Sequence, residues 1–174
     1  MSIRDSFNSA SDESVKVRTD SIDRRILECL QEDGSLSTAQ IALQVGLSQS
    51  PCWRRIRRLE QAGVIRGRVG VLDRQRVGLE VMVFASIKLS EHGTRALPEF
   101  EDAVAALDEV VGAYVTTGEN DYLLKVVTRD IESYERLLRD RLLQLPTVRE
   151  VHSQIVLNET KATTELPIRL VGDD

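Results

Sequence analysis

Four arginines lie within five residues of one predicted helix, at Arg54, Arg55, Arg57 and Arg58. A guanidinium donates hydrogen bonds in a planar fork that suits phosphate oxygens. With about 100° of rotation per helical residue, Arg54, Arg57 and Arg58 point away from the apolar side of the helix, and Arg55 falls on its flank. So dense a positive charge predicts a surface that binds a polyanion.

Two short helices joined by a glycine are predicted to position these arginines. Ile41, Ala42 and Val45 share one side of the first helix. Gly46 ends that helix, because glycine adopts the left-handed conformation at little cost. Leu47 then fills the angle between the helices.

The second helix is predicted to begin at residues 48–51. Ser48 or Ser50 can cap it, and Pro51 falls in the first turn, where a missing N–H is tolerated. Its buried stripe is spaced i, i+4 and i+7 and consists of Cys52, Ile56 and Leu59. This pattern predicts a helix-turn-helix whose second helix enters the major groove of DNA.

The predicted DNA contacts come from the start and the basic face of this helix and from one arginine beyond it. They are Ser48, Gln49, Ser50, Pro51, Arg54, Arg55, Arg57, Arg58 and Arg68. Arg54, Arg57 and Arg58 are expected to carry most of the phosphate contact, so that Arg58→Ala weakens DNA binding without unfolding the protein. The alternative is a merely solvated arginine face, which the adjoining glycine turn and serines disfavour.

The charge distribution separates two halves of the chain. The 174 residues are 41% hydrophobic and carry a net charge of −5. Between Val15 and Arg76 there are twelve Lys and Arg against seven Asp and Glu, a net charge of +5, which leaves −10 for the rest. A basic N-terminal domain joined to an acidic one indicates a DNA reader attached to a domain that does not touch DNA.

Several classes of protein are disfavoured by composition. The two cysteines, Cys29 and Cys52, fall in amphipathic helical patterns and are interpreted as core residues in a reducing cytoplasm, with a sensor thiol as the alternative. No apolar run approaches a membrane span, and no signal-peptide pattern is present. Metal-ligand spacings are absent, so we expect no metal site. We also expect no cofactor and no catalytic residue.

The predicted organisation has four parts: a flexible tail over residues 1–17, a helix-turn-helix domain over 18–66, a linker or wing strand over 67–80, and a second domain over 81–168. Asp20 or Ser21 opens the first helix of the helix-turn-helix domain. The basic segment 66–79 is read as a strand and turn, either a wing beside DNA or a linker between the domains.

The second domain alternates between the two periodicities. Strands are predicted over 81–89, 109–118, 121–129 and 147–157, and helices over 96–107 and 131–145. The order β-α-β-β-α-β is the ferredoxin-like arrangement, and the whole chain is therefore of the α+β class. Both helices cover one face of the sheet, and the bare face predicts a homodimer whose two reading heads contact successive major grooves.

Taken together, these segments resemble the Lrp/AsnC family of transcription regulators, from residue 20 to about 168. In the first domain the resemblance rests on DSIDRRILECLQEDG, LSQSPCWRRIRRLEQAGVIRG and VLDRQRVGL. In the second it rests on TTGENDYLLKV, LLQLPTVREVHSQIVL and KATTELPI. Two positions depart from the common family pattern: Trp53, expected to pack partly against Arg57, and Arg68, which adds a charge near the DNA backbone.

The resemblance implies a cytoplasmic, nucleoid-associated regulator that binds double-stranded DNA and forms dimers, often assembled into octamers. It also implies a small amino-acid effector held near the hairpin 116–122. The implied effector residues are Thr116, Thr117, Gly118, Asn120, Asp121 and Tyr122, with Asp121 accepting the ammonium group. The alternative role for Asp121 is a turn residue that holds its own backbone.

Two other functions compete with an effector-tuned regulator. Sirohaem decarboxylases share the two-domain arrangement, but such an enzyme needs no basic helix and is expected to use His or Arg in the second domain's cleft. Here His92 is predicted in a loop and His152 in a strand. The other alternative is an architectural DNA-binding protein without an effector. The effector, the operator and the sign of regulation are not specified by the sequence.

Overall fold

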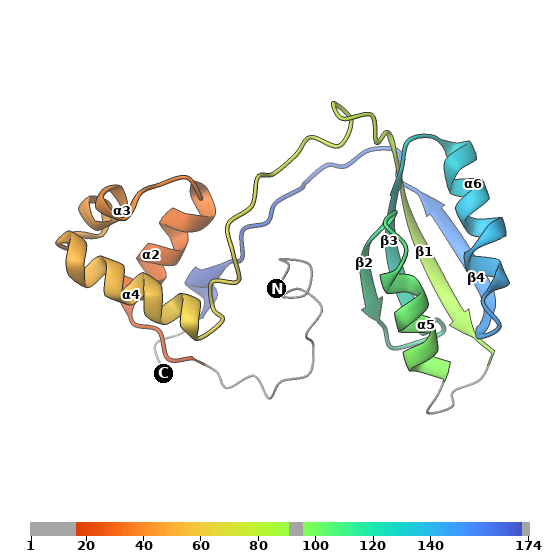
Figure 1. Ribbon diagram of the computed structural model, residues 1–174, viewed down its shortest axis with the longest axis horizontal. Helices are drawn as coiled ribbons and strands as arrows, with labels where there is room; N and C mark the ends of the chain where they lie inside the picture. Colours follow the sequence, from red (N-terminus) through yellow and green to blue (C-terminus); the bar gives the residue numbers. More distant parts are fainter. Residues whose placement is uncertain (1–16, 91–95, 172–174) are drawn as a thin grey trace. The chain divides into compact units, whose positions relative to one another are not determined.

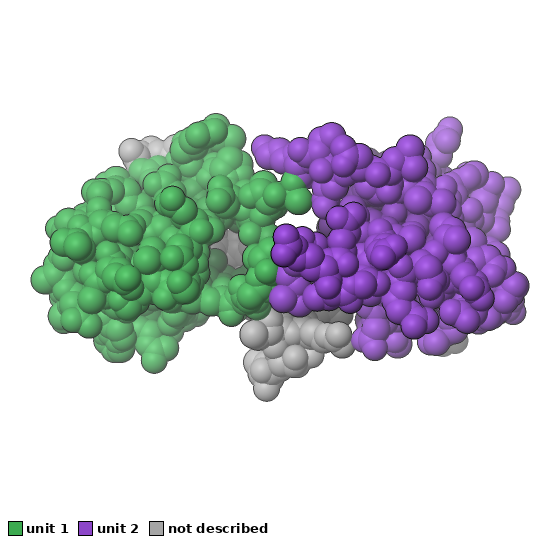
Figure 2. Space-filling view, turned by 90° about the horizontal axis from the view of Figure 1, so that it is seen from above, with its two compact units in different colours: residues 1–71, 162–174 green, residues 72–161 purple. Residues whose placement is uncertain are grey.

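The computed structural model describes residues 17–90 and 96–171 (Figure 1). Its contacts divide the chain into two compact units. The first unit combines the residues up to Val71 with the segment from Ala162 onward, and the second spans Leu72–Lys161 (Figure 2). The predicted tail, residues 1–17, lies outside the described residues except for Val17, and His92 lies outside them too.

The first unit is built on three helices, α2 (Ser21–Glu32), α3 (Thr38–Val45) and α4 (Gln49–Gln61). Asp20 caps α2 as predicted: its carboxylate accepts a hydrogen bond from the Asp23 N–H at 2.8 Å, and the Asp23 carboxylate accepts one from the Asp20 N–H at 3.1 Å. Ser37 caps α3 in the same reciprocal way with Gln40. Such boxes satisfy N–H groups that the helix itself leaves unpaired.

The turn between α3 and α4 has the predicted geometry but lacks the predicted serine cap. Gly46 ends α3 with φ of 74°, in the left-handed region. Ser48 holds the N-cap position of α4, yet its hydroxyl makes no capping hydrogen bond, and its carbonyl accepts from Cys52 N–H at 3.3 Å. Ser50 lies inside the helix. The backbone, rather than a serine side chain, therefore sets the start of α4.

The predicted apolar stripes form one core. Its buried members are Ile26, Ile41, Ala42, Val45, Cys52, Ile56 and Leu59, with Leu47 and Cys29 packed against them. Burial raises the pKa of both cysteine thiols, which keeps them protonated at neutral pH. Cys52 is thus a core residue, as predicted, and the half-buried Cys29 packs against the core.

The predicted strand between the two units is wrong. The described residues between Ile65 and Val81 form no strand, and residues 74–78 make a turn closed by the Leu79 N–H bonding to the Arg74 carbonyl at 2.8 Å. The Arg74 guanidinium also donates to the carbonyls of Leu79 and Glu80. A strand requires a neighbour to receive its backbone hydrogen bonds, and within the described chain this segment has none.

The second unit is a four-stranded antiparallel sheet in the order β2-β3-β1-β4. Its strands are β1 (Val81–Leu89), β2 (Val110–Val115), β3 (Tyr122–Thr128) and β4 (Val148–Ile155). The helices α5 (Ala96–Ala105) and α6 (Ile131–Asp140) follow β1 and β3. This is the predicted ferredoxin-like β-α-β-β-α-β order, and the α+β class is confirmed.

Both helices cover the same face of the sheet (Figure 1). Phe100 and Val104 of α5 and Tyr134 and Leu137 of α6 share one buried cluster with alternate strand residues. The strand members of that cluster are Val83, Ala85, Ile87, Leu89, Tyr122, Leu124 and Val126. The period of two along β1 and β3 therefore sends their other side chains to the opposite face.

That opposite face carries both apolar and polar side chains on its middle strands and polar side chains at β4. Phe84 pairs across the sheet with Lys125 and Gln154, and Leu123 lies beside Tyr114. The ring of Tyr114 lies close to Gly112, where an added Cβ would meet its hydroxyl at 2.8 Å. Tyr114 is 53% exposed. Within the second unit, the described helices α5 and α6 lie on the other face of the sheet.

The C-terminal segment packs on α2, so the predicted end of the second domain at residue 168 differs from the observed division. The side-chain amide of Gln31 both donates to the Leu166 carbonyl at 3.1 Å and accepts from the Leu166 N–H at 2.6 Å. Arg24 donates to the Val171 carbonyl at 2.7 Å. A short 3-10 helix, η2 (Ile168–Leu170), lies between these two attachments.

Gln31→Ala should lower the free energy of unfolding of the helical unit by about 1–2 kcal/mol, since two hydrogen bonds of about 1 kcal/mol each are lost. Trp53, the chain's only tryptophan, lies on α4, so urea unfolding followed by tryptophan fluorescence reports on this unit. Gln44→Ala, at an exposed position of α3, is the matched control. Equal stability of both variants would show that the docked segment contributes nothing.

Candidate functional site

The exposed face of α4 brings together part of the predicted DNA contacts. Arg54 is exposed on the side opposite the Cys52, Ile56 and Leu59 stripe. Within the part of the chain that the structure describes, its guanidinium makes no ion pair or side-chain hydrogen bond. Ser50, Arg54 and Arg57 follow one another at i, i+4 and i+7, so they share a face.

Arg57 is held at the edge of this face by an aromatic ring. Its guanidinium carbon lies 5.7 Å from the centre of the Trp53 ring, a cation–π distance, as predicted. It also pairs with Glu60 at 3.3 Å, one turn along the helix. Trp53 itself is 51% exposed. The ring therefore restricts the guanidinium without removing it from solvent.

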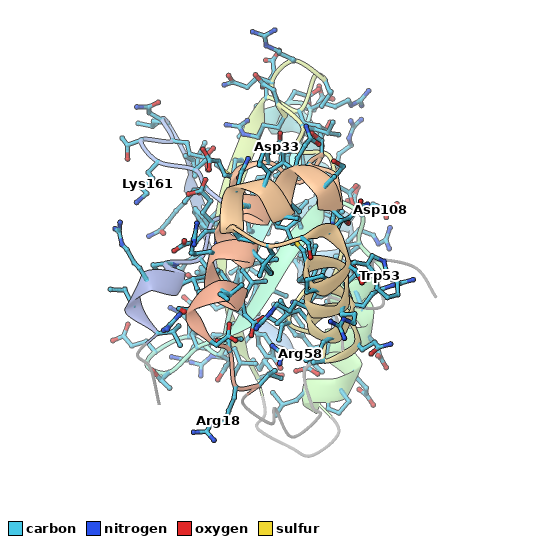
Figure 3. All side chains as sticks on the ribbon, turned by 90° about the vertical axis from the view of Figure 1, so that its left-hand side faces the viewer. Arg18, Asp33, Trp53, Arg58, Asp108 and Lys161 are labelled. Atoms are coloured by element: carbon cyan, nitrogen blue, oxygen red, sulfur yellow. The ribbon has the colours of Figure 1, made fainter. Side chains whose placement is uncertain are left out.

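The other two arginines of α4 turn toward α2. Arg55 donates to Asp20 at 2.6 Å and to Asp23 at 2.9 Å, and Arg58 pairs with the second carboxylate oxygen of Asp23. The prediction that Arg58 points away from the core missed this partner. Asp23 lies on a different helix, so helical periodicity along α4 cannot reveal it. Figure 3 labels Arg58 and Trp53 on α4.

The shared charges shift the ionisation of this cluster. The Asp23 backbone N–H, and after it the Arg55 guanidinium, hold the pKa of Asp20 below its ordinary value, against the opposing effect of burial. Hydrogen bonds to Asp20 and then Asp23 raise the pKa of Arg55. Both residues are therefore charged throughout the neutral range.

The remaining predicted DNA contacts divide into two groups. Ser48, Gln49 and Ser50 are exposed at the start of α4, with Pro51 half-buried beside them. Arg68 lies elsewhere: its guanidinium donates to the Leu36 carbonyl at 3.2 Å, on the loop that joins α2 to α3. The surface assembled around α4 is thus Ser48–Ser50, Arg54 and Arg57.

The predicted effector hairpin forms a six-residue loop between β2 and β3. The Thr116 N–H bonds to the Asp121 carbonyl at 2.9 Å, and the Thr116 hydroxyl donates to the Asn120 carbonyl at 2.9 Å. Gly118 has φ of 117°, a conformation that other residues rarely adopt. Thr117 and Gly118 are exposed at the tip. The loop is therefore closed by its own hydrogen bonds.

Asp121 ties this loop to β1. Its carboxylate accepts the Leu89 N–H at 2.8 Å, and its own N–H donates to the Ile87 carbonyl at 2.8 Å. Asp121 is half-buried. The sequence left two roles open for Asp121, an effector ligand or a turn residue bonded to its own backbone. The structure adds hydrogen bonds between Asp121 and the neighbouring strand β1.

Tyr122 does not face the loop surface, which departs from its predicted place among the effector residues. It is 3% exposed, its ring centre lies 4.7 Å from that of Phe100, and its hydroxyl donates to Glu101 at 2.7 Å. Burial, followed by the Glu101 hydrogen bond, raises the pKa of Tyr122 above its ordinary range. The alternation along β3 turns this ring into the core between the sheet and α5.

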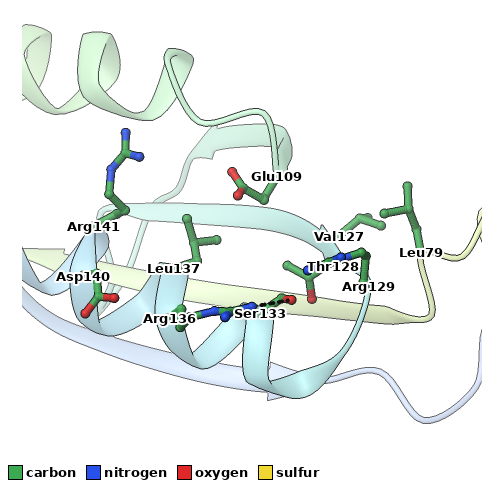
Figure 4. Close-up of a pocket in the computed structure, with 10 residues that line it drawn as sticks. All are labelled: Leu79, Glu109, Val127, Thr128, Arg129, Ser133, Arg136, Leu137, Asp140 and Arg141. Carbon is green, nitrogen blue, oxygen red and sulfur yellow. Dashed lines mark hydrogen bonds between the residues drawn. The ribbon is translucent and has the colours of Figure 1, made fainter.

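The opposite end of β3 borders a pocket of about 400 Å³ (Figure 4). Its lining combines Arg129, Arg136 and Arg141 with Glu109 and Asp140. No motif in the sequence signalled it, because its walls come from the end of β3, from α6 and from the loop before β2. The loop 116–121 takes no part in its lining.

The described residues contain neither a metal-ligand cluster nor a membrane-spanning helix. There, no group of three or more His, Cys, Asp or Glu side chains could hold a metal ion. None of the helices described is long and apolar enough to cross a membrane. His152 of β4 is 60% exposed in its side chain and lies 3.1 Å from the Glu150 carboxylate.

Both units match known domain families. Residues 19–66 match winged helix-turn-helix DNA-binding domains, and residues 82–166 match the Lrp/AsnC ligand binding domain. A curated relative, the proline dehydrogenase transcriptional activator of Rhizobium radiobacter, is 41% identical over 144 residues, which cover 83% of this chain and 92% of the relative.

Two solved structures share the fold over nearly their whole length. A transcriptional regulator from Neisseria meningitidis in complex with L-Met superposes with a TM-score of 0.83 at 35% identity, covering 86% of this chain and 97% of that one. An AsnC family transcriptional regulator from Agrobacterium tumefaciens gives 0.82 at 42% identity, covering 87% and 98%.

Proposed function

Because this chain belongs to the Lrp/AsnC family of transcriptional regulators, we propose that it binds operator DNA through α3 and α4 and that a small amino acid bound by its second unit changes its assembly or DNA affinity. The observation that carries the DNA half is the exposed pair Arg54 and Arg57 on α4, beside Ser48–Ser50. It acts by this binding and not by catalysis, in the cytoplasm on nucleoid DNA.

The recognition surface divides by chemistry. Arg54 and Arg57 reach phosphates or guanine edges, for which a guanidinium has the matching pair of donors. The hydroxyls of Ser48 and Ser50 and the amide of Gln49 lie at the N-terminal end of α4. In a helix-turn-helix that end is the part of the recognition helix that meets the base edges.

The effector site lies at the loop 116–121. A zwitterionic ligand needs donors for its carboxylate and an acceptor for its ammonium group. Backbone N–H groups near Gly118 supply the first, and the Asp121 carboxylate supplies the second. The Neisseria relative forms a complex with L-Met, which supports a free amino acid as the ligand class here. Thr116, Thr117 and Asn120 complete the site.

The sheet face that carries Phe84, Leu123 and Tyr114 is the dimer interface in this proposal, and dimers assemble further into an octamer. Exposed apolar side chains gathered on one sheet face mark a surface that a partner covers. Two-fold symmetry then places two copies of α4 on successive major grooves of a roughly palindromic site, about one helical turn apart or a whole multiple of it.

Leu123→Glu should therefore dissociate the dimer, because Leu123 lies between Ser86 and Tyr114 and the new carboxylate has no cation directly opposite it in the interface. Such a buried charge costs about 3–5 kcal/mol, so the dissociation constant should rise at least about 100-fold. Analytical ultracentrifugation at micromolar concentration measures the dissociation constant of the dimer. The control is Ile131→Glu, at an exposed position of α6 on the other side of the sheet. A monomeric unaltered chain would rule out the interface.

Operator binding is tested by letting the purified full chain select duplexes from a random pool. A palindromic motif with half-sites in helical phase is expected. Retention of the pool without enrichment would favour an architectural protein, and no retention in low salt would refute DNA binding.

A further inference from the structure

Asp23 is the one charged residue among the fully buried side chains of the described chain, with 1% of its surface exposed. Its Oδ2 accepts hydrogen bonds from the Asp20 N–H at 3.1 Å and from the Arg58 guanidinium, and its Oδ1 accepts one from the Arg55 guanidinium at 2.9 Å. No buried side-chain polar atom in the described residues is left without a hydrogen bond.

This cluster links the start of α2 to the helix α4, which carries the recognition surface. Asp20 and Asp23 form the capping box of α2, while Arg55 and Arg58 belong to the helix that carries the recognition surface. A buried carboxylate costs several kcal/mol unless it is paired and hydrogen-bonded. Arg55 and Arg58 are therefore held against α2 by their ion pairs with the Asp23 carboxylate.

We propose that Asp23 is a positioning residue for the DNA interface: it holds Arg55 and Arg58 against α2, so that α4 presents Arg54 and Arg57 as its DNA-contacting cations. This rests on the proposed DNA-binding function. Arg58 keeps half of its side chain exposed, so the ion pair, and not burial, withholds its charge from DNA. Arg55 is held twice, by Asp20 as well as Asp23.

The salt dependence of DNA affinity distinguishes this role from a merely structural one. Each phosphate contact releases condensed counterions and steepens the slope of log affinity against log salt by about 0.9. A change that only loosens the fold lowers affinity at every salt concentration and leaves the slope as it was. The slope therefore counts the cations that reach phosphates.

The first comparison uses two variants that remove the same charge from the same helix. Arg54→Gln should make the slope shallower by about one per reading head if its contact is a phosphate. Arg58→Gln should leave the slope unchanged and lower the urea midpoint reported by Trp53 fluorescence. An equal loss of slope in Arg58→Gln would overturn the proposal.

The second comparison releases Arg58 while Asp20 still holds Arg55. Asp23→Asn should steepen the slope by about one per reading head, and Arg58→Gln added to Asp23→Asn should cancel that gain. If Asp23→Asn does not fold, the Arg54 and Arg58 comparison still decides the matter. Failure of the unaltered chain to bind DNA would refute the proposed function itself, whereas binding with equal slopes for Arg54→Gln and Arg58→Gln would refute only the role of Asp23.

Discussion

Replacing both Arg54 and Arg57 with Gln is expected to weaken operator binding at least about 30-fold. Each good guanidinium contact to a base edge is worth about 1–3 kcal/mol, so losing two costs about 2 kcal/mol or more. Neither arginine pairs with another helix, since Arg57 contacts only Trp53 and Glu60 of its own helix among the described residues. The fold should therefore survive the change.

Fluorescence anisotropy with a labelled operator duplex at fixed salt measures this loss. The matched control is Arg129→Gln with Arg136→Gln, which removes the same charge from the second unit. The control should bind within a few-fold of the unaltered chain. Equal weakening of both double variants would mean that net charge alone drives binding and that α4 is not the reading element.

Asp121→Asn is expected to abolish the response to the amino-acid effector and to leave DNA binding by the ligand-free chain intact. The amide oxygen of Asn can still accept the Leu89 N–H that Asp121 accepts at 2.8 Å, so the loop keeps its attachment to β1. What is lost is the negative charge that pairs with the ligand's ammonium group. An Ala substitution would remove both and confuse the two effects.

Glu119→Gln is the control, because it removes one negative charge from the same exposed loop. The unaltered chain and this control should change DNA affinity by about 5–150-fold when the effector is added, the usual range of coupling between sites. A full response in Asp121→Asn would move the effector site away from this carboxylate.

Features that depend on local pattern were predictable from the sequence. The spacing of Cys52, Ile56 and Leu59 identified the buried side of α4, and Gly46 marked the end of α3 by its conformational freedom. The predicted strand over 81–89 coincides with β1, because alternate burial along a half-covered sheet leaves a strong period of two.

Features that depend on contacts between distant segments were not predictable from the sequence. Arg55 and Arg58 looked like surface charges because their partners Asp20 and Asp23 lie more than thirty positions earlier in the chain. The docking of Leu166 on Gln31 joins residues 135 positions apart and carries no periodic signal. The hydrogen bond from the Leu89 N–H to Asp121 likewise joins residues 32 positions apart, so the sequence of the hairpin alone does not predict it.

The strand predicted over the basic linker failed for a related reason. Val69, Val71 and Val77 have high strand propensity, but a strand is completed only by a neighbour that accepts its hydrogen bonds. Arg74 instead turns back on the carbonyls of Leu79 and Glu80. The strand propensity of these valines was therefore not sufficient to make the segment a strand.

In the proposed function, one chain couples amino-acid binding to DNA binding. The most direct test is to titrate a selected operator duplex with the full chain, in the presence and absence of each of the twenty amino acids at millimolar concentration. We predict nanomolar to micromolar affinity that at least one amino acid shifts about fivefold or more, with the shift lost in Asp121→Asn. Tight operator binding that no amino acid alters, in affinity or in oligomer size, would contradict the coupling and leave an architectural DNA-binding protein.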